Sequence, residues 1–145
     1  MYPTPVGEST VSFVIKATTV AAEMGTAAVN RIAKIRAKGI SIVDGFAQCN
    51  DLDSNATPTA VFSVVITDGT TTKTLIDAST IAQAGGFIRP TKLASTENAI
   101  GFTTDNDDYY VAIVWGTGAA TGVAGTFNVG LTLSGFYKYG DAGAE

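Results

Sequence analysis

The densest group of potential metal ligands lies just before the last apolar segments of the chain. Asp105, Asp107 and Asp108 surround Asn106, and these four side chains could offer oxygen ligands to Ca²⁺. Asn and Asp also favour turns, because their short side chains hydrogen-bond to the nearby backbone. An apolar run follows at once, as expected for a turn that leads into a strand. We therefore interpret this segment as a solvated turn and predict that it binds no metal.

A second acidic segment matches the beginning of a calcium-binding loop. Asp51, Asp53 and Asn55 have the D-x-D-x-N spacing of that motif. The rest of the motif is missing, since Ala56 stands where the loop requires glycine and Phe62 where it requires a bidentate glutamate. The segment is polar and contains a proline, so we predict a loop that binds neither a metal nor any other cofactor.

The sequence offers no group that could activate a nucleophile. Cys49 is the single cysteine, and the chain contains no histidine. A cysteine or serine nucleophile would therefore lack its usual base. No glycine-rich phosphate-binding motif occurs between a strand and a helix. We predict that the protein is not an enzyme and that Cys49 is a buried structural residue, unable to form a disulfide within the chain.

Four of the nine basic residues are concentrated in residues 31–38. Two interpretations of this basic segment stay open: a solvated strand face, or a patch that docks onto an acidic partner. Alternation along a strand would place Lys34, Arg36 and Lys38 on one face. Nucleic acid is a poor match, because no aromatic residues are interleaved to stack on bases. The four residues are Arg31, Lys34, Arg36 and Lys38.

Three aromatic residues lie on one predicted strand near the C-terminus. Strict alternation places Tyr109 and Trp115 on the same face as Val111 and Ile113, and Tyr110 on the other face. Aromatic side chains favour strands and bury large areas, so we expect Tyr109 and Trp115 in the core. The alternative is a sugar-binding platform built on Tyr110 or Trp115.

Strand-like segments must position all of these residues, and no sustained helical period appears. About eight segments alternate at the spacing of sandwiches and barrels, and Asp68-Gly69 is a hairpin-turn signal between two of them. Residues 21–33 are predicted to form a loop with a possible short helix, and Gly39 predicts a bulge. The predicted strands are 9–20, 35–43 (with 46–49 as a short continuation), 59–67, 71–76, 87–93, 99–103, 109–115 and 126–139.

Length and composition fit one β domain of ordinary size. The chain has 145 residues, of which 46% are hydrophobic and 15% are charged, and its net charge is -4. Charged residues are scarce against the roughly 25% of typical soluble domains. The acidic balance argues against nucleic acid as a partner, and no segment has the ~18 continuous apolar residues of a membrane span. We expect an arm at 1–8, a β-sandwich at 9–139 and a tail at 140–145.

The last third of the domain carries a family resemblance. YYVAIVW, the loop GTGAATGVAGT and the final strand FNVGLTLSGFYKY follow one another from Tyr109, and VFSVVITDGTTTKTLIDASTI precedes them. Over residues 59–139 this pattern resembles the small jelly-roll capsid decoration proteins, or cement proteins, of tailed bacteriophages. The resemblance implies an all-β, single-domain, jelly-roll-like antiparallel sandwich with no catalytic residues. It also implies a homotrimer seated on the outer surface of the capsid.

These expectations lead to one predicted function and one rival function. The first is a virion structural protein, made in the host cytoplasm without a signal peptide, that binds the major capsid protein and stabilises the lattice. Its candidate docking residues are Tyr2, Pro3 and Pro5 in the arm, with the basic segment. The rival is a carbohydrate-binding or host-attachment module of a phage tail or a cell surface. That module would use the aromatic platform and a Ca²⁺ site at residues 105–108.

Overall fold

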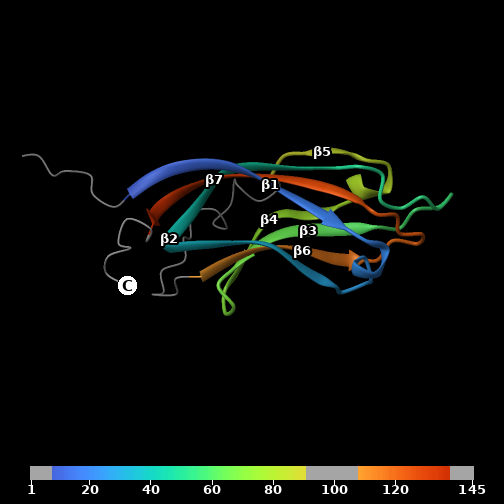
Figure 1. Ribbon diagram of the computed structural model, residues 1–145, viewed down its shortest axis with the longest axis horizontal. Coiled ribbons are helices and arrows are strands. Elements are labelled where there is room, and N and C mark those ends of the chain that lie inside the picture. Colours follow the sequence, from blue (N-terminus) through green and yellow to red (C-terminus); the bar gives the residue numbers. More distant parts are fainter. Residues whose placement is uncertain (1–7, 91–107, 138–145) are drawn as a thin grey trace, which may run out of the picture.

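The computed structural model describes residues 8–90 and 108–137, and its regular structure is almost entirely β (Figure 1). This confirms the predicted all-β class. Among the described residues, no helix is long and apolar enough to span a membrane. The strands are β1 (Glu8–Thr19), β2 (Val29–Cys49), β3 (Val61–Thr67), β4 (Thr72–Ser79), β5 (Gly86–Ile88), β6 (Asp108–Thr117) and β7 (Gly125–Tyr137), with 3₁₀ turns η1 (Ala21–Glu23) and η2 (Ile81–Gln83).

The strands form two antiparallel sheets that share β2. Sheet A has the order β1-β7-β2-β5, and sheet B has the order β2-β6-β3-β4. Residues 29–36 of β2 pair with β6 in sheet B, and residues 37–49 pair with β7 and β5 in sheet A. With the two halves of β2 counted separately, each sheet has four strands. The result is the predicted jelly-roll-like sandwich of eight strands.

The course of β2 differs from the sequence prediction. The strand begins at Val29, whereas residues 21–33 were expected to form a loop with a short helix, and only η1 is helical there. The ladder to β6 shifts register between Arg31 and Ala33, so the alternation that identifies a strand is interrupted. The predicted bulge at Gly39 is confirmed, because the ladder to β7 shifts between Lys38 and Ile40. The predicted strand 99–103 lies outside the described residues.

The core fills the space between the two sheets. Phe62 of β3 and Trp115 of β6 come from sheet B, and Phe127 of β7 comes from sheet A. Their ring centroids are 5.0 Å apart for Phe62 and Phe127 and 5.9 Å apart for Trp115 and Phe127, both in edge-on geometry. All three side chains are buried. Edge-on contacts between aromatic rings stabilise a fold beyond the effect of the area that the rings bury. The three side chains therefore hold sheet A and sheet B together.

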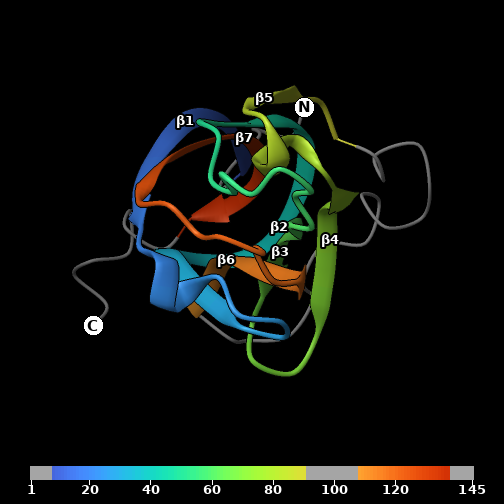
Figure 2. The ribbon, with the colours of Figure 1, turned by 90° about the vertical axis from the view of Figure 1, so that its right-hand side faces the viewer.

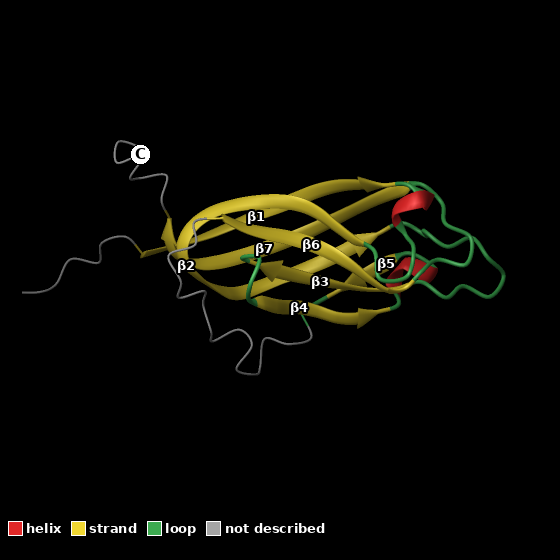
Figure 3. Cartoon of the chain, turned by 90° about the horizontal axis from the view of Figure 1, so that it is seen from below, coloured by secondary structure: helices red, strands yellow, loops and turns green. Residues whose placement is uncertain are grey.

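Four connections gather at one end of the sandwich, where both 3₁₀ turns also lie (Figures 2 and 3). They are residues 20–28, 50–60, 80–85 and 118–124, and we call this end the loop end. Backbone hydrogen bonds tie the connections together: Leu52 N–H donates to Ala82 O, Val123 N–H to Leu52 O, and Ala119 N–H to Met24 O. The loops therefore form one connected layer across the ends of both sheets.

Removing one ring of the aromatic cluster tests its role in joining the sheets. We expect Phe127→Ala to lower the free energy of unfolding by about 3–5 kcal/mol, as for other large-to-small core changes. The measurement is urea unfolding followed by tryptophan fluorescence, which reports on Trp115 directly. Val123→Ala, at an exposed loop position, is the matched control and should change stability by less than about 0.5 kcal/mol. An equal loss of unfolding free energy in the two variants would contradict a role for Phe127 in joining the sheets.

Candidate functional site

The side chain of Asp53 is buried at the loop end and accepts hydrogen bonds from two connections at once. Its Oδ2 accepts the backbone N–H groups of Thr59 (2.8 Å), Ala60 (3.1 Å) and Ala120 (2.9 Å). Its Oδ1 accepts the N–H of Thr121 at 2.8 Å. Residues 50–60 lead from sheet A to sheet B, and residues 118–124 lead back. One carboxylate therefore holds two of the connections that cross between the sheets.

The charge of Asp53 is stabilised by these donors. Burial by itself would raise the pKa of this carboxyl, but the N–H groups of Thr121, Thr59, Ala120 and Ala60 favour the ionised form and hold the pKa well below its ordinary value. The oxygens that a cation would need are thus already committed to the backbone. Within residues 8–90 and 108–137, no three His, Cys, Asp or Glu side chains converge as metal ligands would. Asp105, Asn106 and Asp107 lie outside this part of the chain.

The first half of the basic segment packs against β6. The guanidinium carbon of Arg31 lies 4.1 Å from the ring centroid of Tyr110, and Lys34 Nζ lies 3.4 Å from Asp108 Oδ2. Both basic side chains are solvent-exposed, so these contacts contribute little to folding. They hold the two charges on the outer face of sheet B.

The second half of the basic segment follows β2 from one sheet to the other. Arg36 pairs with Asp108 of β6, whereas Lys38 pairs with Phe136 of β7. The backbone therefore places Arg36 in sheet B and Lys38 in sheet A, and the structure does not describe their side chains. The other candidate docking residues, Tyr2, Pro3 and Pro5, lie outside the described residues.

The structure confirms the predicted core face of β6. The burial of this face also bears on the alternative sugar-binding site on Tyr110 or Trp115. Tyr109, Val111, Ile113 and Trp115 are all buried. Trp115 therefore cannot serve as a sugar-binding platform. Tyr110 is half-buried on the opposite face, where the guanidinium of Arg31 covers its ring.

Cys49 is a buried free thiol, as predicted. Burial, with a smaller contribution from the nearby negative charge of Asp51, raises the pKa of the Cys49 thiol to about 12. The thiol is therefore protonated at neutral pH and unreactive as a nucleophile.

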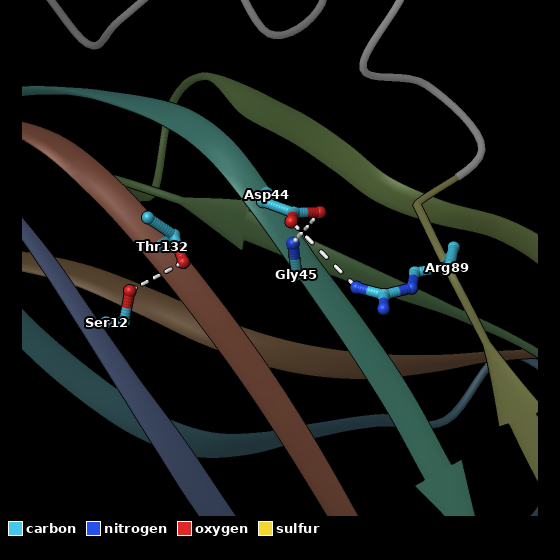
Figure 4. A network of polar contacts seen from close by, with 5 residues as sticks. All are labelled: Ser12, Asp44, Gly45, Arg89 and Thr132. Carbon is cyan, nitrogen blue, oxygen red and sulfur yellow. Dashed lines mark hydrogen bonds and ion pairs between the residues drawn. The ribbon is translucent and has the colours of Figure 1, made fainter.

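A shallow groove of about 250 Å³ lies on the outer face of sheet A, where sequence analysis predicted no site. Figure 4 shows the polar residues around it: Ser12 Oγ and Thr132 Oγ1 of adjacent strands are 2.7 Å apart, and Asp44 and Arg89 face each other nearby. The floor is formed partly by Gly130, where an added Cβ would overlap the Phe46 ring. Glycine at this position therefore lets the ring lie flat on the sheet.

Phe46 and Arg89 line one side of the groove, and Phe87 packs against both of them from outside its lining. The rings of Phe46 and Phe87 are stacked with centroids 5.3 Å apart, and the Arg89 guanidinium carbon lies 5.3 Å from the Phe87 centroid. Arg89 Nη1 approaches Asp44 Oδ2 only to 3.9 Å, and both side chains are mostly exposed. Such a pair is weak and can exchange partners readily. Val14, which is 58% exposed, forms part of the opposite wall.

The size of the groove restricts what it can hold. Sites for small molecules and cofactors usually have about 300–1,000 Å³ and enclose most of the ligand. A cavity of about 150 Å³ already accepts a benzene ring. The groove, at about 250 Å³ and open to solvent, therefore matches one large side chain of a protein partner better than a cofactor or an oligosaccharide.

Comparisons with solved structures show that the fold of this chain is similar to that of chains in two phage capsids. A chain in the capsid of Ralstonia phage GP4 superposes with a TM-score of 0.70 at 22% identity, over 93% of this chain and 90% of that chain. A chain in the capsid asymmetric unit of cyanophage Pam1 gives a TM-score of 0.68 at 23% identity, over 93% and 91%. No protein-family model and no curated protein matches the sequence. At these identities, the likeness establishes the fold.

The hydrogen bonds of Asp53 can be tested by an almost isosteric change. In Asp53→Asn the new amide would face the N–H donors of Thr59 and Ala120, so we expect a loss of about 3 kcal/mol of unfolding free energy at pH 7. Asp51→Asn is the matched control. Its side chain is exposed and an Asn oxygen can still accept the N–H of Asp53, so the loss should stay below about 0.5 kcal/mol.

The pH dependence supplies a second measurement on the same variants. The pKa of Asp53 is lowered by folding, so its stabilising contribution is complete above the ordinary carboxyl pKa of about 4 and is lost as the pH falls below it. The difference in stability between the parent and Asp53→Asn should therefore shrink from pH 7 to pH 3 in urea titrations. A constant difference over that range would contradict a depressed pKa.

Proposed function

We propose that this chain is a structural component of a phage virion that binds the outer surface of the capsid and stabilises the lattice without catalysis. The observation that carries the proposal is the superposition on chains of two phage capsids. Because the superpositions span nearly all of both chains, the matched chains are about as long as this one. A small jelly roll of this size suits an accessory lattice component.

The proposed partners are the major capsid protein of a phage head and further copies of the chain itself. We infer a homotrimer, since a chain with only 15% charged residues can cover much of its surface in symmetric contacts. Residues 1–7 and the basic segment are the proposed contacts with these partners. Exposed Arg31 and Lys34 would guide association through charge, in a salt-dependent manner. A component that binds only the assembled shell stabilises it by mass action.

Heads of the cognate phage, assembled without this chain, provide the direct test of binding. We expect the purified protein to sediment with these heads and to raise the temperature at which they rupture. Charge reversal at Lys34, Arg36 and Lys38 should weaken binding roughly tenfold at low salt, with less effect at high salt. Lys73→Glu on β4 is the control and should bind like the parent. A parent protein that stays in the supernatant at micromolar concentration would refute the proposal.

The oligomeric state is measured separately from binding. Light scattering at micromolar concentration should give three times the 14.9 kDa mass of the chain. If the trimer forms only on the shell, imaging of decorated heads should show clusters of three. A monomer in solution and on heads would contradict the homotrimer while leaving capsid binding intact.

A further inference from the structure

The outer-face groove of sheet A is a hollow among the described residues to which the proposed function assigns no role. Its apolar lining is partly exposed: Val14 is 58% accessible, and Phe87, which stacks on the lining residue Phe46, is 50% accessible. Exposed apolar residues that line a groove with a polar rim mark a protein-binding site. Ser12, Thr132, Asp44 and Arg89 supply that rim. The groove therefore offers an aromatic wall and hydrogen-bonding groups to one side chain of a partner.

The edge of the sheet beside the groove is also open. Strand β1 pairs only with β7 among the described strands, over 12 residues and without a register shift. A long regular edge strand presents unpaired backbone groups that an extended segment can use. Ser12 and Val14 of this strand also line the groove. An extended segment could therefore lie along β1 and place one side chain in the groove.

The chain itself contains a segment with this chemistry. Residues 1–7 carry Tyr2, Pro3 and Pro5, and no charged side chain precedes Glu8. Segments in which prolines alternate with other residues favour extended or polyproline II structure, and they dock onto aromatic-lined grooves. A tyrosine fits a groove of about 250 Å³, with its ring against Phe46 and its hydroxyl toward the polar rim.

The source of the segment follows from where it joins the fold. Residue 7 directly precedes the first residue of β1, and Ser12 and Val14 of that strand line the groove. To reach the groove of its own protomer, the segment would have to reverse direction between Pro5 and Glu8. We propose that Tyr2, within residues 1–7 of a second copy, occupies the outer-face groove. We call this contact between neighbouring protomers the clasp. This rests on the self-association proposed above.

Cysteine crosslinking between full-length chains tests the contact. One chain carries Tyr2→Cys and the other carries Val14→Cys, and the two are mixed and mildly oxidised. Cys49 does not interfere, because it is buried and protonated. We expect a disulfide-linked heterodimer, formed several-fold more than when the second chain carries Val29→Cys. Val29 is a matched control, since its exposure is 59% and it lies at the start of β2 in sheet B.

Three outcomes would overturn the proposal: equal crosslinking to Val14→Cys and Val29→Cys, no crosslinking to Val14→Cys, or an intramolecular link in one chain that carries both Tyr2→Cys and Val14→Cys. A second test places a charge in the groove. Val14→Asp should keep the parent's far-ultraviolet circular dichroism spectrum but shift the light-scattering mass toward the monomer, whereas Val29→Asp should keep both. If Val14→Asp keeps the parent's mass, the groove has no role in self-association.

These readouts separate this inference from the proposed function. A parent that sediments with heads while its groove variants remain trimeric would refute the clasp and leave capsid binding intact. A parent that forms crosslinked trimers but never binds heads would refute capsid binding and leave the clasp intact. Groove variants that stay trimeric but lose head binding would assign the groove to the shell and overturn the clasp.

Discussion

The arrangement of the two sheets depends on a buried carboxylate at the loop end. Asp53 accepts backbone N–H groups from residues 59–60 and 120–121, which belong to two of the connections that cross between the sheets. A buried charge is costly unless it is fully hydrogen-bonded, and this one is satisfied by donors that exist only when both connections are in place. Folding of the loops and ionisation of Asp53 are therefore coupled.

The second constraint is the continuous path of β2 through both sheets. Because one strand contributes residues 29–36 to sheet B and 37–49 to sheet A, the sheets cannot be separated without breaking its ladders. The bulges at 31–33 and 38–40 let the strand change partners without a loop. The aromatic cluster of Phe62, Trp115 and Phe127 fills the space that this bend encloses.

These constraints leave the outer faces free for binding. On sheet B, the exposed Arg31 and Lys34 lie over β6, and on sheet A the groove lies between Val14 and Phe46. The two surfaces differ in chemistry, since one is basic and the other is apolar with a polar rim. The two surfaces fit the two contacts proposed above, the basic face with the shell and the groove with a further copy of the chain.

The sequence by itself determined the all-β class, the core face of β6 and the burial of Cys49, because alternation and residue type are local properties. It could not reveal the role of Asp53, whose partner Thr121 is 68 residues away, or the early start of β2, where a bulge breaks the alternation. The groove depends on Phe46 and Gly130, and Phe87 stacks on Phe46; these three residues come from three strands and carry no shared motif. Only the register of those strands, fixed by the packing of the whole sandwich, brings them together.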